Sequence, residues 1–482
     1  MFSFTNISSY QQQLKEGKIS CVEAVNCYLE KIKGNKLNAF VDVYEKEALE
    51  KARLLDERRI SGKQTGKLHG VVISLKDVIA YKGHKLSASS KMLKEFVSIY
   101  DSTAVKKLLE EEAIIIGNCN CDEFAMGNTN ENSVYGRVKN AFDENKVPGG
   151  SSGGSAVSVQ AGLCMVSVGS DTGGSVRQPA DFCGIVGLKP SYGTISRHGL
   201  IAYASSFDQI GIFANNVEDI ARVLEVISGA DDYDSTVKQQ KELKNILPQV
   251  SQNATSKKFR ITVLKNALEH ESLDSEIRSS IYDLTKKLKN DNFIVEEIDF
   301  DLIDYVVPAY YVLTTAEASS NLSRYDGVRY GYRHENQSED LSTFYKMNRG
   351  KGFGKEVKKR IMLGTFVLSE GYYDAYFTRA QKVRKLLALR TEEIFKNFDA
   401  VLLPTVPSTA FEAGSVEKDP IAGYLADIFT VFANLTGIPG ISLPLFKHSN
   451  GMPFGVQLLA NKDDDVTLLQ MSKLLLDGYK TY

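Results

Sequence analysis

Two turns rich in glycine and serine, Gly149–Ser155 and Thr172–Ser175, enclose an apolar segment within the stretch from Pro148 to Pro179. Serine hydroxyls are common nucleophiles, and glycine lets main-chain N–H groups approach a substrate oxygen closely. A flexible linker is also rich in these residues, but it would not continue into a hydrophobic segment and a second glycine turn. We therefore expect this stretch to carry the chemistry of the protein.

Two familiar glycine motifs fit the first turn poorly. A phosphate-binding loop ends in Gly-Lys-Ser/Thr, and Gly154-Ser155-Ala156 has no lysine. The G-x-S-x-G pattern of an α/β-hydrolase is met formally with Ser151 as nucleophile, but that elbow follows a hydrophobic strand, and residues 143–148 are mostly polar. That mechanism also needs a histidine base, and no downstream histidine has a distinguishing setting (His198, His270, His334 and His448).

A third possibility is a serine hydrolase whose base is a lysine. Lys76 ends the apolar run that begins at Gly70, and Asp77 follows it. Burial at the end of such a strand would disfavour the ammonium form and lower the lysine pKa. An ordinary salt-bridged lysine at a strand end is the structural alternative. The residues alone favour Ser151 as nucleophile and leave the role of Lys76 open.

Several segments, taken in order, resemble the amidase signature enzymes. They are Gly70–Asp77, Asp122–Gly127, Gly149–Ser155, Asp171–Arg177 and Phe182–Pro190. Three more segments are similar to the A subunits of the glutamyl-tRNA(Gln) amidotransferases within that family: Ala316–Tyr330, Arg360–Thr365 and Gly371–Tyr376. The resemblance therefore covers nearly the whole chain.

The resemblance implies a relay of three side chains. Ser175 becomes the nucleophile in place of Ser151, Ser151 becomes the bridging serine that precedes a cis peptide bond to Ser152, and Lys76 becomes the base. It also implies an oxyanion hole formed by the main-chain N–H groups of the second turn (Thr172, Gly173, Gly174 and Ser175).

The same resemblance implies two substrate-binding residues. Arg360 would bind the α-carboxylate of glutamine, and Asp427 would bind its α-ammonium group. A guanidinium pairs with two carboxylate oxygens and a carboxylate accepts from an ammonium group, so both assignments are chemically sound. Lys358 and Lys359 are adjacent candidates for the carboxylate-binding role.

The function implied is that of a glutaminase subunit in a heterotrimer. Glutamine would be hydrolysed to give ammonia for a B subunit, which amidates mischarged glutamyl-tRNA(Gln) with ATP, while a C subunit joins the two. We expect no metal or cofactor in this chain, with ATP, Mg²⁺ and the tRNA held mainly by the partner. The resemblance leaves open whether aspartyl-tRNA(Asn) is also a substrate.

Two alternatives remain. A stand-alone amidase would act on other small amides, and a non-catalytic scaffold would keep the fold only to dock partners. The presence of Lys76, Ser151 and Ser175 argues against the scaffold.

The whole chain must position these residues. The 482 residues, 43% hydrophobic and 24% charged, are enough for a very large core. The net charge of -2, without a dense basic run, argues against a surface that wraps nucleic acid. Six cysteines without a Cys-x-x-Cys pair and six scattered histidines predict reduced thiols and no zinc site. The first twenty residues resemble no secretory signal and no apolar run approaches about 20 residues, so we expect a cytoplasmic protein without membrane spans.

Apolar runs alternating with helical patterns predict an α/β fold. We expect strands at Gly70–Lys76, Ala113–Gly117, Cys164–Gly169, Phe259–Leu264, Phe293–Ile298, Ala400–Leu403 and Phe454–Leu459. We expect helices within residues 20–59, at Thr103–Glu112, Val217–Ser228, Ser275–Leu288 and Tyr372–Phe395, and from Asp465. A longer helical region follows the strand at Phe293–Ile298 and extends through Leu322. The polar, lysine-rich residues 230–258 predict a surface linker or a subdomain boundary.

The resemblance implies one amidase domain over residues 1–482, with a mixed central β-sheet covered by α-helices on both faces. Within it we expect a helical entry segment at 1–65, a signature core at 66–230, a helical and strand subdomain at 231–395, and a return to the core sheet at 396–482.

Overall fold

A computed structural model describes residues 2–238, 243–251, 258–291, 293–335, 340–418, 423 and 425–482. In this part of the chain, eleven strands form a mixed sheet in the order β1-β3-β2-β4-β6-β5-β10-β11-β9-β7-β8. The strands are β1 (Phe40–Val43), β2 (Val72–Lys76), β3 (Ile114–Cys119), β4 (Val166–Asp171), β5 (Val186–Lys189), β6 (Gln209–Ala214), β7 (Arg260–Leu264), β8 (Ile294–Ile298), β9 (Ala400–Pro404), β10 (Gly440–Lys447) and β11 (Pro453–Ala460).

The central strands β2 and β4 are parallel neighbours, with Ile73 opposite Val166. Their carboxyl ends therefore meet at one edge of the sheet, which brings Lys76 close to the end of β4 at Asp171. All residues of both strands are buried. An apolar run covered on both faces is typical of such a strand, which is why the sequence predicted them.

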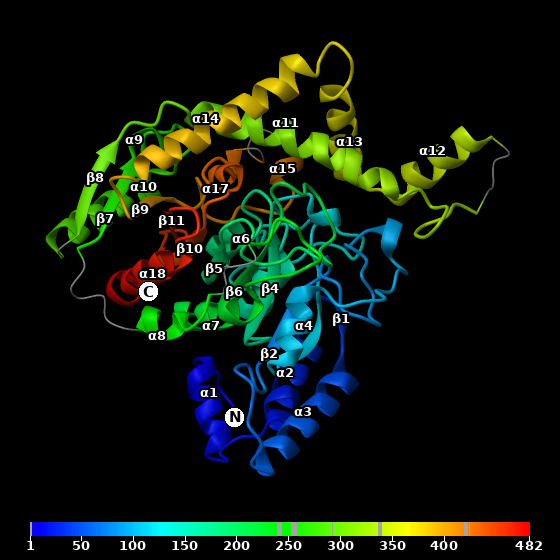
Figure 1. The fold of residues 1–482 in the computed structure, drawn as a ribbon, viewed down its shortest axis with the longest axis vertical. Helices are drawn as coiled ribbons and strands as arrows, with labels where there is room; N and C mark the ends of the chain where they lie inside the picture. The colour runs from blue at the N-terminus through cyan, green and yellow to red at the C-terminus, as the bar shows by residue number, and fades with distance from the viewer. Residues whose placement is uncertain are drawn as a thin grey trace.

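Helices cover the sheet on both sides, as Figure 1 shows. Below it in that view lie α7 (Val217–Ile227), α8 (Ile246–Ser251) and α18 (Asp465–Tyr479), and above it lie α11 (Ile303–Asn321), α13 (Lys355–Val367) and α14 (Arg379–Ile394). The remaining helices are α1 (Ile7–Lys15), α2 (Cys21–Lys33), α3 (Glu45–Ile60), α4 (Thr103–Glu110), α5 (Gly153–Gln160), α6 (Arg177–Phe182), α9 (Lys265–Leu268), α10 (Ser275–Asn290), α12 (Leu341–Gly352), α15 (Ser415–Lys418) and α17 (Val431–Thr436).

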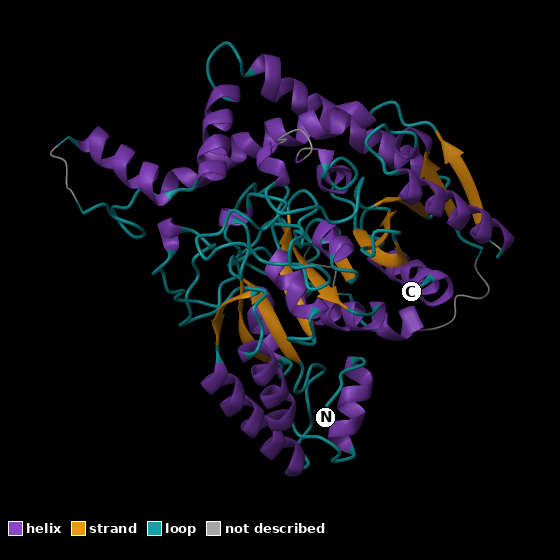
Figure 2. Ribbon diagram, turned by 180° about the vertical axis from the view of Figure 1, so that it is seen from behind, coloured by secondary structure: helices purple, strands orange, loops and turns teal. Residues whose placement is uncertain are grey.

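The predicted fold class is confirmed: the sheet is mixed and helices cover it. Figure 2, coloured by secondary structure, shows the central strands between helices and loops, one edge of the sheet at the periphery, and a group of helices at the N-terminal end. All seven predicted strands are present within a few residues of their expected bounds.

Three sequence predictions need correction. The stretch 230–258 is not a plain surface linker, because it contains α8, where Ile246 and Val250 are buried; a subdomain boundary there stays a prediction. Residues 239–242 and 252–257 of this stretch lie outside the described residues. The helix expected at Tyr372–Phe395 starts only at Arg379, after a π-helical turn at Asp374–Thr378. The strands β1, β5, β6 and β10 were not predicted, because glycine, proline and polar residues interrupt their apolar patterns.

None of the helices in the described ranges combines the length and apolar character needed to span a membrane. All six cysteines are free thiols, and five of them are buried.

Candidate active site

Lys76 is the last residue of β2, and its side chain has no exposed surface. Its Nζ donates to Ser151 Oγ at 2.7 Å and to Ser170 Oγ at 2.9 Å. Burial lowers the pKa of Lys76 to about 8, although nearby carboxylates such as Asp122 oppose the shift. The alternative of a salt-bridged lysine fails, because Asp77 turns its carboxylate to Ser87 and to the main-chain N–H of Ser89, at 2.9 Å from the latter. A lysine that is partly neutral near pH 8 can accept a proton from the serine it contacts.

Ser151 lies in the loop that enters α5. Its main-chain oxygen accepts from Asp122 N at 3.1 Å, and Gly150 N donates to Gln178 Oε1 at 2.9 Å. The sequence placed a cis peptide bond after Ser151, and the structure corrects this: the cis bond joins Gly150 to Ser151. Glycine has no Cβ to crowd the following residue, and a Cβ on Gly150 would lie 2.2 Å from an Asp122 carboxylate oxygen.

Ser170 is a third hydroxyl group at this centre, and the sequence analysis missed it. It precedes Asp171 at the carboxyl end of β4, and it is held there because Ser152 Oγ donates to its main-chain oxygen at 3.0 Å. The signal that could have found it is the parallel pairing of β2 with β4, in which Leu75 lies opposite Val168, so that the carboxyl ends of the two strands are neighbours.

The second glycine turn is folded around the carboxylate of Asp171. Gly174 N donates to Asp171 Oδ1 at 2.9 Å and Val176 N donates to Oδ2 at 3.1 Å. The Arg177 guanidinium contacts both carboxylate oxygens, at 3.1 and 3.2 Å. Burial alone would raise the pKa of Asp171, but the Arg177 charge outweighs it and lowers that pKa to about 2. The carboxylate therefore stays ionised and fixes the turn.

This geometry changes the predicted oxyanion hole. Because Gly174 N–H is bonded to Asp171, it is not available to a substrate oxygen. Thr172 is fixed by its hydroxyl, which donates to Asp208 at 2.6 Å, and Gly173 presents its main-chain oxygen to the Thr430 hydroxyl at 2.7 Å. The candidate donors are thus the N–H groups of Thr172, Gly173 and Ser175. Ser175 itself is buried, with 9% of its surface exposed.

Arg360 and Asp427 both lie close to Tyr311. The Tyr311 hydroxyl donates to Asp427 Oδ2 at 2.9 Å, and the Arg360 guanidinium lies 5.7 Å from the Tyr311 ring centroid. Asn128 Nδ2 approaches the same Asp427 oxygen at 3.4 Å. Burial raises the pKa of Asp427 to about 7, so a cation beside it would favour its ionised form.

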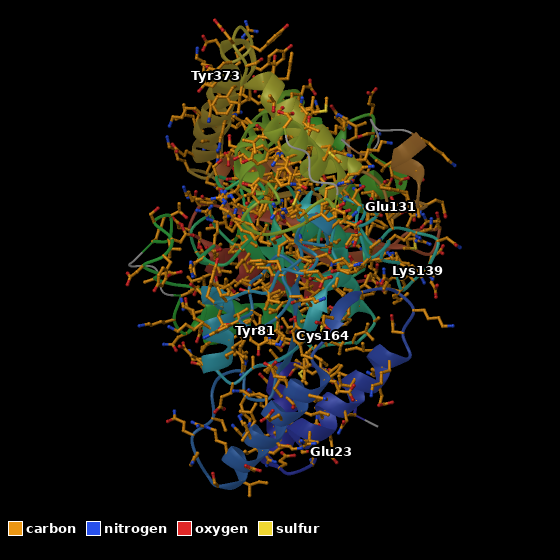
Figure 3. The ribbon with its side chains drawn as sticks, turned by 90° about the vertical axis from the view of Figure 1, so that its right-hand side faces the viewer. Glu23, Tyr81, Glu131, Lys139, Cys164 and Tyr373 are labelled. Carbon is orange, nitrogen blue, oxygen red and sulfur yellow. The ribbon has the colours of Figure 1, made fainter. Side chains whose placement is uncertain are left out.

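A cavity of about 410 Å³ opens beside these groups, lined by Asn128, Glu131, Tyr311, Glu356 and Arg360 among others. Figure 3 labels Glu131 close to α15, drawn in orange, and Gly414 N donates to the Glu131 carboxylate at 2.8 Å. The cavity size is suited to a small polar molecule. Within the described ranges, no group of three or more histidine, cysteine and acidic residues could hold a metal ion.

The environment of Arg360 separates it from its lysine neighbours. Its NH1 group donates to the Tyr203 hydroxyl at 2.7 Å and its Nε to Glu356 at 2.8 Å, and it is 8% exposed. Lys358 and Lys359 are exposed, and Lys358 Nζ donates to Gly350 O. Of the three cations, Arg360 is the one that is buried, while Lys359 also lines the cavity.

Comparisons with known proteins agree with this architecture. The sequence model described as Amidase matches residues 23–469. The chain is 48% identical to the A subunit of glutamyl-tRNA(Gln) amidotransferase from Fusobacterium nucleatum, over 95% of this chain and 93% of the relative. It is 45% identical to the protein of the same name from Prochlorococcus marinus, over 97% and 95% of the two chains.

Among solved structures, the chain is similar to the glutamyl-tRNA(Gln) amidotransferase A subunit from Thermotoga maritima. The TM-score is 0.75 at 36% identity, and the match covers 96% of this chain and 95% of the other. The chain therefore belongs to the amidase family and, within it, to the group of the glutamyl-tRNA(Gln) amidotransferase A subunits.

Proposed function

We propose that the chain hydrolyses an amide through a Ser-Ser-Lys relay. Ser175 Oγ attacks the amide carbon and gives its proton to Ser151, while Ser151 gives its own proton to neutral Lys76. The tetrahedral intermediate collapses with proton transfer to the leaving nitrogen, which departs as ammonia. Water then hydrolyses the acyl-Ser175 ester by the same proton path in reverse.

The observation that carries this proposal is the contact between Lys76 and Ser151. Their side chains lie 2.7 Å apart, and burial lowers the pKa of Lys76 to about 8. A base with a pKa near the working pH combines a useful neutral fraction with enough basicity to take a proton. The N–H groups of Thr172, Gly173 and Ser175 would bind the oxyanion as it forms.

The proposed substrate is glutamine. Arg360, which lines the cavity and donates to the Tyr203 hydroxyl, would bind an α-carboxylate. Asp427, which accepts from the hydroxyl of the cavity residue Tyr311, would bind an α-ammonium group. The names of the relatives support this assignment, because an amidotransferase needs a nitrogen donor. Ammonia would pass to a partner B subunit in a complex with a C subunit, and the partner would use ATP and Mg²⁺ to amidate glutamyl-tRNA(Gln) in the cytoplasm. Aspartyl-tRNA(Asn) is a second proposed acceptor.

The proposal is tested by glutaminase and transamidation assays on the complex purified with its partner subunits. We expect Ser175→Ala and Lys76→Ala to abolish ammonia release from glutamine. Asp427→Ala should raise KM for glutamine strongly, and unchanged hydrolysis by this variant would refute the substrate assignment. Both mischarged tRNAs should be offered, since the acceptor is decided by which of them gains the amide.

A further inference from the structure

Glu123 is a buried carboxylate that the proposed chemistry does not use. It begins the short 3₁₀ turn Glu123–Ala125 that follows β3, and it is 4% exposed. Its Oε1 accepts from the Ser90 hydroxyl, and its Oε2 accepts from the main-chain N–H of Gly354 at 2.8 Å. The second contact joins residues 231 positions apart in the chain.

Gly354 is the N-cap residue that precedes α13, and it has no side chain to cap that helix. A Cβ at Gly354 would lie 2.3 Å from Glu123 Oε2, so the approach requires glycine there. A carboxylate at the start of a helix accepts from unpaired N–H groups and interacts favourably with the helix dipole. Glu123 thus supplies from the core the capping hydrogen bond that the N-cap residue Gly354 cannot make with a side chain, next to the acidic residue Glu356 of the first turn.

Aromatic packing by Phe124 lies beside the hydrogen bond between Glu123 and Gly354. The Phe124 ring lies 5.6 Å from the Phe353 ring centroid and 4.9 Å from that of Tyr325. Phe124 has a φ of 51°, in the left-handed region, so the main chain turns sharply where the two side chains leave the core. Glu123 and Phe124 together dock the start of α13.

The two neighbours of this contact are the proposed reaction centre and the proposed substrate site. Asp122, the preceding residue, donates its N–H to Ser151 O at 3.1 Å. Arg360 lies on α13, six positions after Gly354 and within the same helix as Glu356, its ion-pair partner at 2.8 Å. The contact between Glu123 and Gly354 therefore connects the loop that holds Ser151 to the helix that holds Arg360, and it fixes the distance between these two side chains.

We propose that Glu123 is a positioning residue for Arg360, holding the first turn of α13 so that the guanidinium meets the α-carboxylate of the bound substrate. This inference rests on the proposed function, in which Arg360 binds that carboxylate. Loss of Glu123 would therefore weaken binding through the carboxylate and leave the relay intact.

The test compares two substrates in the complex purified with its partner subunits. One is glutamine, and the other is 4-aminobutanamide, which keeps the amide and the ammonium group but lacks the α-carboxylate. We expect Glu123→Ala to raise KM for glutamine about tenfold, the size of a lost hydrogen bond to a charged group, without changing kcat/KM for 4-aminobutanamide. Glu123→Gln, which keeps one oxygen near Gly354 N–H, should recover part of the loss.

Two controls separate the possible failures. Asp274→Ala removes a carboxylate cap from α10, where Asp274 accepts from Glu276 N at 2.7 Å, and it should leave both substrates unaffected. Arg360→Ala tests the proposed function itself: if it leaves KM for glutamine unchanged, that function is wrong. If Arg360→Ala raises KM and Glu123→Ala does not, the positioning role is wrong. An equal fall of kcat/KM for both substrates in Glu123→Ala also contradicts it.

Hydrogen exchange gives a measurement that does not depend on either substrate. In Glu123→Ala, and to a smaller extent in Glu123→Gln, the amides at the start of α13 should exchange at least about tenfold faster, because the contact that closes this helix end is lost. Unchanged exchange there would overturn the proposal.

Discussion

The carboxylate of Asp171 and the guanidinium of Arg177 form an ion pair that has no exposed surface on either side chain. The pair lies directly behind the second glycine turn. Arg177 also donates to Thr430 O at 2.8 Å and to Asn434 Oδ1 at 2.7 Å, so the turn is tied to α17 and the segment before it. A pair this well bonded offsets the cost of removing both charges from water.

Removing one partner of this ion pair should strongly destabilise the folded protein. Arg177→Met leaves the Asp171 carboxylate buried without its counter-ion, and we expect a loss of about 3 to 5 kcal/mol in the free energy of unfolding. The measurement is urea denaturation of the variant beside Arg329→Met, whose ion pair with Asp326 is largely exposed on the arginine side. The control should lose less than about 1 kcal/mol. Equal losses in both variants would show that the buried pair contributes little.

The same ion pair predicts that the stability of the protein falls at low pH. The pKa of Asp171 is lowered to about 2 in the folded protein, below its ordinary value of 3.8, so its contribution to stability is full above about pH 4. That contribution is lost as the pH falls through about 2. We expect Asp171→Asn to lose this part of the acid dependence, as followed by the urea midpoint between pH 5 and 2. Parallel curves for the two proteins would contradict the assignment.

The lowered pKa of Lys76 predicts that glutaminase activity rises with pH. The proposed relay needs neutral Lys76, and burial lowers its pKa from 10.5 to about 8. The value of kcat/KM for glutamine should therefore rise with pH and level off above about 8. Lys76→Arg keeps a charge that does not dissociate, and it should be inactive at every pH. A pH profile that is flat from 6 to 9 would exclude Lys76 as the base.

Ser170 should influence the pH at which kcat/KM for glutamine rises, because it contacts Lys76. Its hydroxyl accepts from Lys76 Nζ at 2.9 Å, and a hydrogen bond to the charged form stabilises it. Ser170→Ala removes this support, so the pKa of Lys76 should fall further and the rising limb should move to lower pH, with a loss of about tenfold in kcat from the less well held base. Ser158→Ala is a suitable control, since its hydroxyl contacts Ser74 and Cys164 and not Lys76. An unshifted limb in Ser170→Ala would refute this role.

Periodicity and motif order were enough to predict much of the fold. The buried strands β2, β3 and β4 have continuous apolar runs, and turns with glycine or charge mark their ends, so their existence follows from local sequence. Strands β5, β6 and β10 have no such runs, because glycine, proline and polar residues interrupt their apolar residues, and neighbours elsewhere in the chain bury them. Gly187 and Gly211, for example, lie close to Val176, a contact that no local pattern records.

Some residues of the candidate site could likewise be found from the sequence, whereas several of its contacts could not. The sequence motifs indicated Lys76, Ser151 and Arg360, and the structure shows the first two in contact. Residue type alone could not reveal that Gly174 N–H is bonded to Asp171, that the cis bond precedes Ser151, or that Ser170 contacts Lys76. The contact of Ser170 with Lys76 follows from the pairing of β2 with β4, whereas the Gly174 bond and the cis bond belong to the conformation of each glycine turn.

Gly174 provides the sharpest test of the second turn. Its φ of +123° is one that residues with side chains rarely adopt, and a Cβ there would lie 2.3 Å from the Thr430 hydroxyl oxygen. Gly174→Ala must therefore displace either the turn or Thr430, whose hydroxyl donates to Gly173 O at 2.7 Å. Because removal of one oxyanion donor lowers kcat by a factor of about 10² to 10³, we expect at least that loss when the whole turn is shifted.

The matched control is Gly350→Ala in α12, where an added Cβ meets nothing within 4 Å. This substitution should stabilise the helix by about 0.5 to 1 kcal/mol without affecting turnover. Glutaminase kinetics and thermal unfolding of both variants check these outcomes, and wild-type kcat in Gly174→Ala would show that the turn does not hold the reacting groups.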